Sequence, residues 1–536
     1  MGNANISFKW VNTTGNGPAI GGLVTDVLVV PVEQQAKGKG KESSGKGKKQ
    51  GKGDAATLVW SKVLSELDKA LGGQLKPLLA AEEFTGKAKA VWAMPVRKGD
   101  ALKARWVLLV GLGQADKADM KQATDCLVAG FKQGLKYKSA PQHTVLLPTT
   151  LGKLDLADLS AAAVFAASRA SYKTQQAKPD NPPKIKTVAL WTPAAHKLGA
   201  KTLQVAQIMA TVEANTKDLA NMPANLKRAE TLATFARAIK GRGVTCNIIS
   251  NVQQIQRKFP AFYAVAQGSV REDPPRFIHL TYTPPAKGSG KTAVKPKRHI
   301  ALVGKGVIFD TGGVQVKPGN FMNDMKFDMT GAATVLSVFK GLVQLQLPNI
   351  KVSCFVAATK NAVGEFAYTP DSIIDSASGK KIEVRHTDAE GRLTLADAVY
   401  TAAQQKPDEM ITIATLTGAA MMAVGHCTAL MGTDDKLVGR IDQSGKRVGE
   451  RIQPLDLFEE DFEAIKSKRD AADLSNSLDQ RERGHMTAGA FVISFGDGVP
   501  MAHMDIAGGD AKDGNATGIA AKGLLQFLID SAHPSK

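Results

Sequence analysis

Short apolar segments alternate with amphipathic ones along most of the chain, and this alternation constrains the fold more than any other feature. In the first 195 residues, strand-like segments such as TDVLVVPV, RWVLLVGLG and TVALWTP are separated by helix-like ones such as WSKVLSELDKAL and LADLSAAAVFAASRAS. The second half repeats the order, with RHIALVGKG, KVSCFVAATK, EMITIATLTG and VPMAHMDIAG as buried strands and GAATVLSVFKGLVQL and RLTLADAVYTAAQQ as helices. This pattern predicts α/β domains with largely parallel sheets.

The length of the chain indicates more than one domain. A chain of 536 residues exceeds what a single hydrophobic core usually supports. The segment LGAKTLQVAQIMATVEANTKDLA reads as one long helix that NMPAN ends, because proline cannot continue a helix. We therefore expect an N-terminal α/β domain over 1–197, a linker helix over 198–222 and a catalytic domain over 223–536.

The basic charge of the chain is partly local. The net charge is +19, and the segment 37–53, KGKGKESSGKGKKQGKG, contributes seven lysines and one glutamate, or +6, of it. This composition predicts a disordered insertion in a strand-to-helix loop. Such an insertion either binds polyanions, or serves solubility or no function at all. The chain has no apolar run long enough to cross a membrane, no secretory signal and no C-x-x-C pair, so we expect a cytoplasmic protein.

Four carboxylates follow predicted strands of the second half. Asp310 ends VGKGVIFD, Asp328 lies in MKFDMTGAA, and VRHTDAEGRL, residues 384–393, holds Asp388 and Glu390. Acids on every second residue do not share a helix face but do share one side of an extended segment, so we expect this segment to be a strand end. Strand ends followed by glycine turns are where open α/β sheets place ligands.

Burying these four carboxylates together requires counter-ions. Two divalent cations bring +4 against −4, which favours a dinuclear site, and oxygen-rich ligation suits Mn, Mg, Co or Zn. Two metals about 3.5–4 Å apart hold one water between them and lower its pKa. Lys305 could ligate only as a neutral amine, Lys317 could stabilise an oxyanion, and Arg392 could hold a small planar anion. The alternative is that D-x-E-x-R is a solvated strand edge with weak ion pairs.

The motifs together resemble the leucyl aminopeptidases, also called cytosol aminopeptidases. VGKGVIFDTGGVQVKP, MKFDMTGAA and TDAEGRLTLADA match that family in order and spacing, and ATLTGA, ADLSN and HMDIAG follow. The resemblance is strong over 200–536 and weak before it. It implies an N-terminal macro-like α/β domain and a C-terminal dizinc-peptidase domain, a phosphorylase/hydrolase-like α/β/α sandwich, in a homohexamer.

The resemblance also implies roles for individual residues. The metal ligands would be Lys305, Asp310, Asp328, Asp388 and Glu390, with Asp310 and Glu390 bridging two ions and Lys305 and Asp328 on the tighter one. Lys317 would polarise the scissile carbonyl, and Arg392 would hold a bicarbonate ion that acts as general base. The wall of the pocket for the first side chain would include Met325, Thr415, Gly418 and Ala507. A metal would bind the free amino group, so that only N-terminal residues are removed.

Two departures from the family pattern bear on the site. His386 stands where the family usually has Asn, either as an added ligand or as a neighbour that tunes the loop. Asp510 lies where an apolar pocket residue is expected, which would change a simple preference for leucine.

The sequence therefore predicts a metal-dependent aminopeptidase that removes leucine or a similar apolar residue from short peptides, with two divalent ions (Zn or Mn, Co or Mg) and bicarbonate. The rival class is a hexameric protein that binds nucleic acid through its basic surface. An inactive structural relative would lack a ligand, whereas all five predicted ligands are present.

Overall fold

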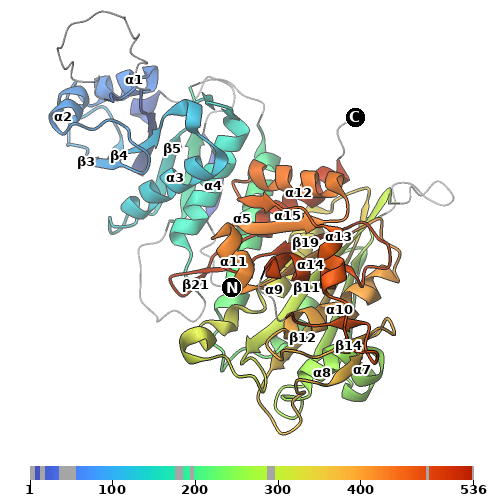
Figure 1. Cartoon of the computed structure of the whole chain (residues 1–536). Helices are drawn as coiled ribbons and strands as arrows, with labels where there is room; N and C mark the ends of the chain where they lie inside the picture. Colours follow the sequence, from blue (N-terminus) through green and yellow to red (C-terminus); the bar gives the residue numbers. More distant parts are fainter. Residues whose placement is uncertain are drawn as a thin grey trace, which may run out of the picture. The chain divides into compact units, whose positions relative to one another are not determined.

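The computed structural model describes residues 6–11, 19–35, 56–174, 185–193, 198–285, 296–478 and 482–533. The lysine-rich segment 37–53 lies outside these ranges. The chain divides into two compact units, one formed by 1–173 with 177–210 and the other by 174–176 with 211–536. The division falls within helix α5 (Ala200–Asn221), which occupies most of the segment predicted as a linker helix. Each unit has its own β-sheet (Figure 1).

The smaller unit is built on a six-stranded sheet in the order β1-β8-β5-β2-β4-β3. All neighbouring strands are parallel except β3 and β4. The strands are β1 (Ser7–Trp10), β2 (Thr25–Glu33), β3 (Val91–Pro95), β4 (Ala104–Gly113), β5 (Gln142–Leu146) and β8 (Thr187–Trp191), with a short hairpin of β6 (Thr150–Leu151) and β7 (Leu154–Asp155). Its helices are α1 (Lys62–Ala70), α2 (Leu75–Ala81), α3 (Met120–Gly134) and α4 (Leu156–Ser171).

The larger unit is built on an eight-stranded sheet in the order β17-β16-β19-β15-β11-β12-β10-β9. The four central strands, β19 to β12 in that order, are parallel, as predicted, whereas β10 and β16 run antiparallel to their neighbours in the centre. The strands are β9 (Val244–Ile249), β10 (Arg276–Tyr282), β11 (Arg298–Asp310), β12 (Ile350–Asn361), β15 (Glu409–Ala414), β16 (Thr428–Gly432), β17 (Ile452–Pro454) and β19 (Met501–Asp505). Smaller sheets contain β13 (Ile373–Asp375), β14 (Lys381–Glu383) and β18 (Leu474–Ser475), and β20 (Ala511–Lys512) with β21 (Asn515–Ala516).

Two groups of helices cover this sheet (Figure 1). In one group α9 contacts α6 and α15, and in the other α10 contacts α8 and α14; both α9 and α10 also contact β11. Strands β11 and β12 are buried along nearly their whole length, as expected for strands covered on both faces. The larger unit is therefore an α/β/α sandwich. Its helices are α6 (Ala229–Arg237), α7 (Val252–Lys258), α8 (Pro260–Ala266), α9 (Thr330–Leu345), α10 (Glu390–Ala403), α11 (Gly418–Val424), α12 (Asp435–Arg447), α13 (Glu459–Ala464), α14 (Gly484–Ile493) and α15 (Ala521–Ala532).

Glycine allows helix α9 to approach the central strands closely. A Cβ atom on Gly331, in the first turn of α9, would lie 2.1 Å from the carbonyl oxygen of Ile413 on β15 and 3.0 Å from the backbone nitrogen of Lys305 on β11. A side chain at this position would therefore push α9 away from the sheet. This close contact holds the start of α9 beside Lys305. Among the described residues, no helix is both long and apolar enough to span a bilayer.

Candidate active site

Strand β11 supplies the first two residues of the site. Lys305 and Asp310 lie on this strand, and the pairing of β11 with β12 shifts in register just before Asp310. The Asp310 carboxylate accepts hydrogen bonds from the Gly312 N–H (2.9 Å) and from the Asn361 side-chain amide (2.8 Å). Gly312 has a φ of 90°, which only glycine adopts without strain. The turn brings Lys317 back to Asp310, with 2.8 Å between their charged atoms.

Asp328 lies between the short 3₁₀ helix η5 (Met325–Phe327) and the start of α9. Its Oδ1 accepts a hydrogen bond from the Thr415 hydroxyl (2.8 Å) and lies 2.7 Å from Lys305 Nζ. Its Oδ2 is buried and has no hydrogen-bond partner within the described part of the chain. A buried carboxylate oxygen without a donor is costly, and a cation would satisfy it.

The prediction that 384–393 is a strand end is wrong. Residues 387 and 388 form a turn, and Glu390 is the first residue of helix α10. Thr387 holds the turn, because its hydroxyl donates to Gly312 O (2.6 Å) and its carbonyl accepts from Asn361 (3.0 Å) and Tyr368 (2.7 Å). The carboxylate of Glu390 is favourable there because the N-terminus of a helix carries a partial positive charge.

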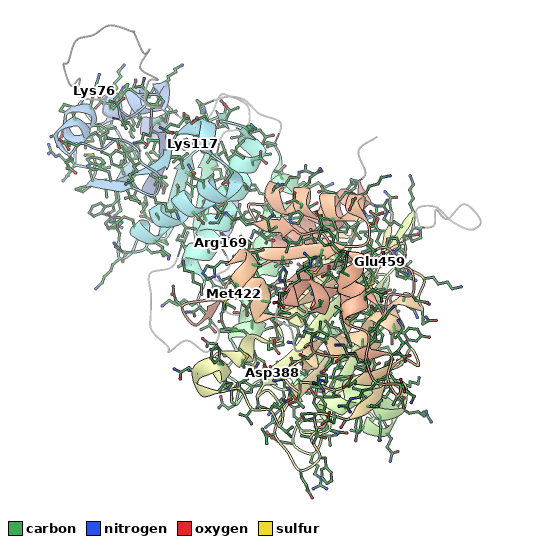
Figure 2. The ribbon with its side chains drawn as sticks, in the orientation of Figure 1. Lys76, Lys117, Arg169, Asp388, Met422 and Glu459 are labelled. Atoms are coloured by element: carbon green, nitrogen blue, oxygen red, sulfur yellow. The ribbon has the colours of Figure 1, made fainter. Side chains whose placement is uncertain are left out.

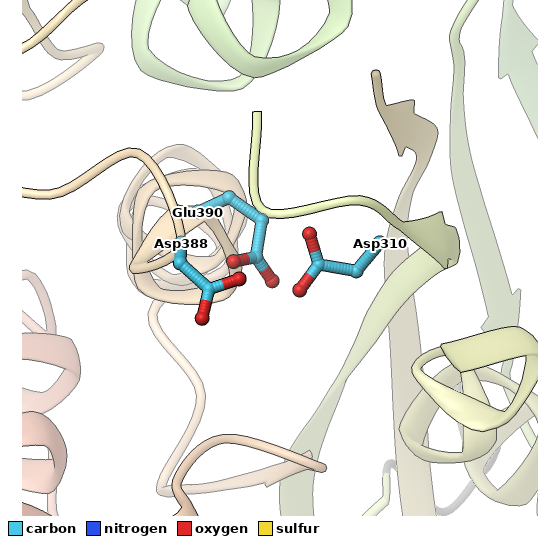
Figure 3. A group of neighbouring side chains, drawn as sticks. All are labelled: Asp310, Asp388 and Glu390. Carbon is cyan, nitrogen blue, oxygen red and sulfur yellow. The ribbon is translucent and has the colours of Figure 1, made fainter. Parts of the chain in front are cut away.

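The turn and the strand end bring three carboxylates together (Figure 3). One oxygen each from Asp310, Asp388 and Glu390 lie within 4.8 Å of one another. The two lysines join this group to Asp328: Lys305 Nζ lies 2.8 Å from Glu390 as well as near Asp328, and Lys317 Nζ lies 2.6 Å from Asp388. A Cβ on Gly391 would lie 2.4 Å from Lys305 Cε, so a larger residue at 391 would displace the lysine side chain from its present position. The structure thus brings the five predicted ligands and Lys317 into one cluster.

The charges of the cluster shift the pKa of its members. Burial opposes the charge of Lys305, but the carboxylates of Asp328, Glu390 and Asp310 outweigh burial and raise its pKa. The pKa of Lys317 is raised in the same way, by Asp310, Glu390 and Asp388. Burial raises the pKa of Asp328 well above its usual value, and burial with the charges of Asp310 and Glu390 raises that of Asp388 to about 7.

The residues present fit a divalent metal centre. Four carboxylates (−4) and two ammonium groups (+2) give the cluster a net charge of −2 when all are ionised, and most of these side chains are buried. Oxygen donors with one lysine nitrogen suit hard or borderline divalent cations. The buried Oδ2 of Asp328, which has no hydrogen-bond partner among the described residues, independently fits the role of a cation ligand. The solvated strand edge considered above does not describe this buried cluster.

Arg392 lies in the first turn of α10, beside the carboxylates rather than among them. Its Nη1 donates to the carbonyl of Asn476 (2.7 Å), while its Nε is buried and has no hydrogen-bond partner within the described residues. Burial lowers the pKa of Arg392 to about 10, against the opposing effect of Glu390 and Asp505, so the guanidinium keeps its charge at neutral pH.

The predicted pocket residues lie on segments that meet at the site. Thr415 is tied directly to the cluster, because its carbonyl accepts from Lys305 (2.8 Å) and its hydroxyl donates to Asp328. Gly418 begins α11, and Met325 begins η5. Buried Asp505 joins the remaining segment, since its carboxylate accepts from Leu416 N (3.1 Å), the Thr417 hydroxyl (2.8 Å) and Ala507 N (3.1 Å).

The sequence patterns did not predict three residues whose hydrogen bonds position the segments of the site: Asn361, Asn476 and Asp505. Asn476 accepts from the N–H groups of Arg385 and His386 and donates to the His386 carbonyl (2.7 Å). Asn476 and Asp505 both lie inside recognised motifs, ADLSN and HMDIAG, so their positions could have been noted. Asn361 follows the apolar strand KVSCFVAATK, and a polar residue at a strand end was the only available signal for it.

The two departures have structural explanations. His386 is exposed, and its Nδ1 accepts a hydrogen bond from the backbone N–H of Asp388 (3.1 Å), a contact that an asparagine side chain could also make. Asp510 is largely buried, which raises the pKa of its carboxyl to about 6, although backbone N–H groups of its own loop donate to it. Its carboxylate therefore binds its own backbone.

Both domains of this chain match models of one known protein family. Residues 214–526 match the catalytic domain of the cytosol aminopeptidase family, and residues 47–181 match its N-terminal domain. Probable cytosol aminopeptidases of Persephonella marina and Syntrophotalea carbinolica are 35% and 36% identical to this chain, each over 87% of it and 93% of the relative.

Two solved structures have a similar fold over nearly the whole of this chain. A mutant of tomato leucine aminopeptidase superposes with a TM-score of 0.82 at 26% identity, covering 98% of this chain and 97% of that one. The bottromycin maturation enzyme BotP in complex with Mn shares the fold, with a TM-score of 0.74 at 24% identity over 95% of this chain and all of that one. The chain belongs to the cytosol aminopeptidase family and is a metal-dependent aminopeptidase.

Proposed function

We propose that this enzyme removes leucine or a similar apolar residue from the N-terminus of short peptides, using two divalent ions and an arginine-held bicarbonate. The observation that carries the proposal is the convergence of Asp310, Asp388 and Glu390 within 4.8 Å, with Asp328 joined to them through Lys305. Zinc and manganese are the first candidates for the ions, and cobalt and magnesium are further ones.

The arrangement supports a division of the ligands between two ions. Glu390 shares Lys305 with Asp328 on one side and lies near Asp310 and Asp388 on the other, as a bridging carboxylate would. In this scheme Asp310 would also contact both ions, Lys305 and Asp328 would hold one ion, and Asp388 would hold the other. Lys305 would ligate as the neutral amine, since nearby cations disfavour its charged form. When bound, the ions supply Lewis acidity and lower the pKa of the attacking water.

Lys317 and Arg392 would supply the catalytic charges. The Lys317 side chain is 14% exposed, more than that of Lys305 at 4%, so its ammonium can reach a substrate carbonyl and stabilise the negative charge that develops there. The buried Nε of Arg392 has no partner in the described part of the chain, and a planar bicarbonate would accept its hydrogen bond. Arg392 would thus hold the anion beside the carboxylate cluster, where bicarbonate would supply a general base.

The first-residue pocket would be formed by Met325, Thr415, Gly418 and Ala507. Gly418 has open space where a Cβ would point, which leaves room for a substrate side chain. Met421 on α11 packs beside Gly508, next to Ala507, and so adds apolar surface. Because the Asp510 carboxylate is engaged by its own backbone, a preference for an apolar first residue is retained.

We further infer a homohexamer from the family resemblance, and a cytoplasmic location from the names of the curated relatives. Light scattering coupled to size-exclusion chromatography measures the assembly directly. A mass of six chains of 56.7 kDa supports the inference, and a monomer contradicts it.

A second candidate function is nucleic-acid binding through basic surface. The net charge of +19 and the +6 of segment 37–53 favour it, and lysines such as Lys76 and Lys117 lie on the smaller unit (Figure 2). The test compares DNA binding by the full chain and by a chain lacking 37–53 at physiological salt. Loss of binding with an unchanged peptidase rate would show that both functions coexist, and no binding by the full chain would remove the candidate.

Hydrolysis of leucine p-nitroanilide after chelation, and after addition of Mn, Co or Zn, tests the main proposal. Glu390→Ala serves as the inactive variant, and Glu365→Ala, which changes a carboxylate that is 76% exposed, serves as its control. Metal-restored activity that Glu390→Ala loses and Glu365→Ala keeps supports the proposal. A folded protein without activity in any metal contradicts it.

A further inference from the structure

Lys227 is a buried lysine in the segment between α5 and α6. It is 1% exposed and ranks among the largest fully buried side chains of the structure. Within the described residues it forms no ion pair with a carboxylate, in contrast to the other fully buried lysine, Lys522, which pairs with Glu213 at 2.6 Å. Lysine is rarely buried without a charged partner. The contacts of Lys227 therefore need an explanation.

The ammonium of Lys227 has three acceptors around it. Its Nζ donates to the carbonyl oxygens of Ala220 (2.8 Å) and Lys326 (2.5 Å) and lies 3.4 Å from the sulfur of Met329. An ammonium group has three N–H donors, so donors and acceptors match in number. Ala220 lies in the last turn of α5, where carbonyl groups lack intrahelical partners and a positive charge is favourable.

Two of these three contacts flank a metal ligand. Lys326 precedes Asp328 by two residues, and Met329 follows it directly. The Asp328 carboxylate itself contacts Lys305 and Thr415. The Lys227 ammonium thus contacts the backbone of Lys326 and the side chain of Met329, on either side of Asp328. It also connects both to Ala220 at the end of α5.

The burial of Lys227 is unfavourable by itself. Desolvation lowers its pKa to about 7, and the charge of Lys326 adds to the effect. An apolar side chain of similar length would fill the same volume without this cost, and apolar replacements of buried charges often stabilise proteins. Stability alone therefore does not account for a lysine at this position.

We propose that Lys227 is a positioning residue for Asp328, and that it fixes this ligand at the distance required for tight binding of a divalent cation. The proposal rests on the proposed function, because it assumes that Asp328 ligates a metal. Residues that contact metal ligands and orient them typically contribute about 10- to 100-fold to metal affinity. Lys227 would act in this way through the segment 326–329.

The test measures Mn²⁺ binding to the metal-free full chain by isothermal titration calorimetry, with no substrate present. In Lys227→Met we expect the Kd of the tighter ion to rise about tenfold or more, while the Kd of the weaker ion changes less, because Asp388 lies on a different segment. We also expect kcat to fall at limiting metal and to recover at high metal with little change in KM. A purely structural role would lower the unfolding temperature without changing the tighter Kd.

Lys522→Met is the matched control, since it removes an equally buried lysine from the same unit but not from the site. It should lower stability and leave both Kd values within about twofold. If Lys227→Met does not fold, Lys227→Gln, which keeps N–H donors without a charge, is measured by the same criterion. An unchanged tighter Kd in a folded Lys227 variant overturns the proposal. Absence of Mn²⁺ binding by the unmodified chain would instead overturn the proposed function.

Discussion

Replacing Asp388 by asparagine should stabilise the metal-free protein at alkaline pH. Burial and the charges of Asp310 and Glu390 raise the pKa of Asp388 from 3.8 to about 7. A carboxyl group with a raised pKa binds its proton more tightly in the folded than in the unfolded state. Its contribution to stability is therefore complete below about pH 4 and is lost as the pH rises through 7. Asparagine cannot ionise, so Asp388→Asn avoids this loss.

The structure sets the size of the effect. A shift from 3.8 to about 7 corresponds to about 4 kcal/mol at 1.36 kcal/mol per pKa unit. The Asp388 side chain is 31% exposed, so solvent screening reduces the effect to roughly 2 kcal/mol. In the Asp388→Asn variant, the Lys317 ammonium loses its ion pair with residue 388 but keeps the one with Asp310. We therefore expect Asp388→Asn to gain roughly 2 kcal/mol at pH 8 and close to nothing at pH 4.

The assay is urea unfolding with a chelator at both pH values. All five tryptophans (Trp10, Trp60, Trp92, Trp106 and Trp191) lie in the smaller unit. Tryptophan fluorescence therefore follows that unit and should not change, while circular dichroism also follows the larger unit. With saturating Mn²⁺ the unmodified protein should instead be the more stable of the two. Mn²⁺ at 1,000 times Kd stabilises the unmodified protein by about 4 kcal/mol and the variant by less. A metal-free Asp388→Asn protein less stable than the parent at pH 8 would refute the reasoning.

Three further outcomes are expected. Lys317→Met should lower kcat about 10²- to 10³-fold with a small change in KM, because it removes a charge used in the transition state; a change confined to KM would contradict this role. Arg392→Met should remove the dependence of the rate on added bicarbonate, and a variant that still responds to bicarbonate would place the anion elsewhere. Asn476→Ala should destabilise the larger unit by about 1 kcal/mol in chemical unfolding, because it leaves partly buried backbone groups of Arg385 and His386 without their side-chain partner; an unchanged midpoint would argue against that function.

The sequence could predict the central part of the fold and the identity of the clustered residues. The strand that carries both Lys305 and Asp310 is an almost continuous apolar segment, and such segments indicate a buried parallel sheet. The flanking antiparallel strands β9 and β10 are not among the predicted strands, because their segments mix polar and apolar residues and their pairing depends on distant parts of the chain.

The geometry around Asp388 and Glu390 could not be predicted in the same way. Alternating acids predict a strand, but the hydrogen bonds of Thr387 with Gly312, Asn361 and Tyr368 impose a turn, and helix α10 begins immediately after it. These partners lie between 19 and 75 residues away in the chain. Local periodicity contains no information about such contacts, so tertiary structure decides the backbone conformation here.

The number of metal ions per chain tests the central claim, that these carboxylates hold a dinuclear centre. The measurement is elemental analysis of the full chain after loading with Mn²⁺ or Zn²⁺ and removal of unbound metal. The account predicts two ions per chain in the unmodified protein, and fewer in Glu390→Gln, which loses a bridging carboxylate but keeps the size of the side chain. A stoichiometry of one ion or none in the unmodified, active protein, or two ions retained in Glu390→Gln, would contradict it.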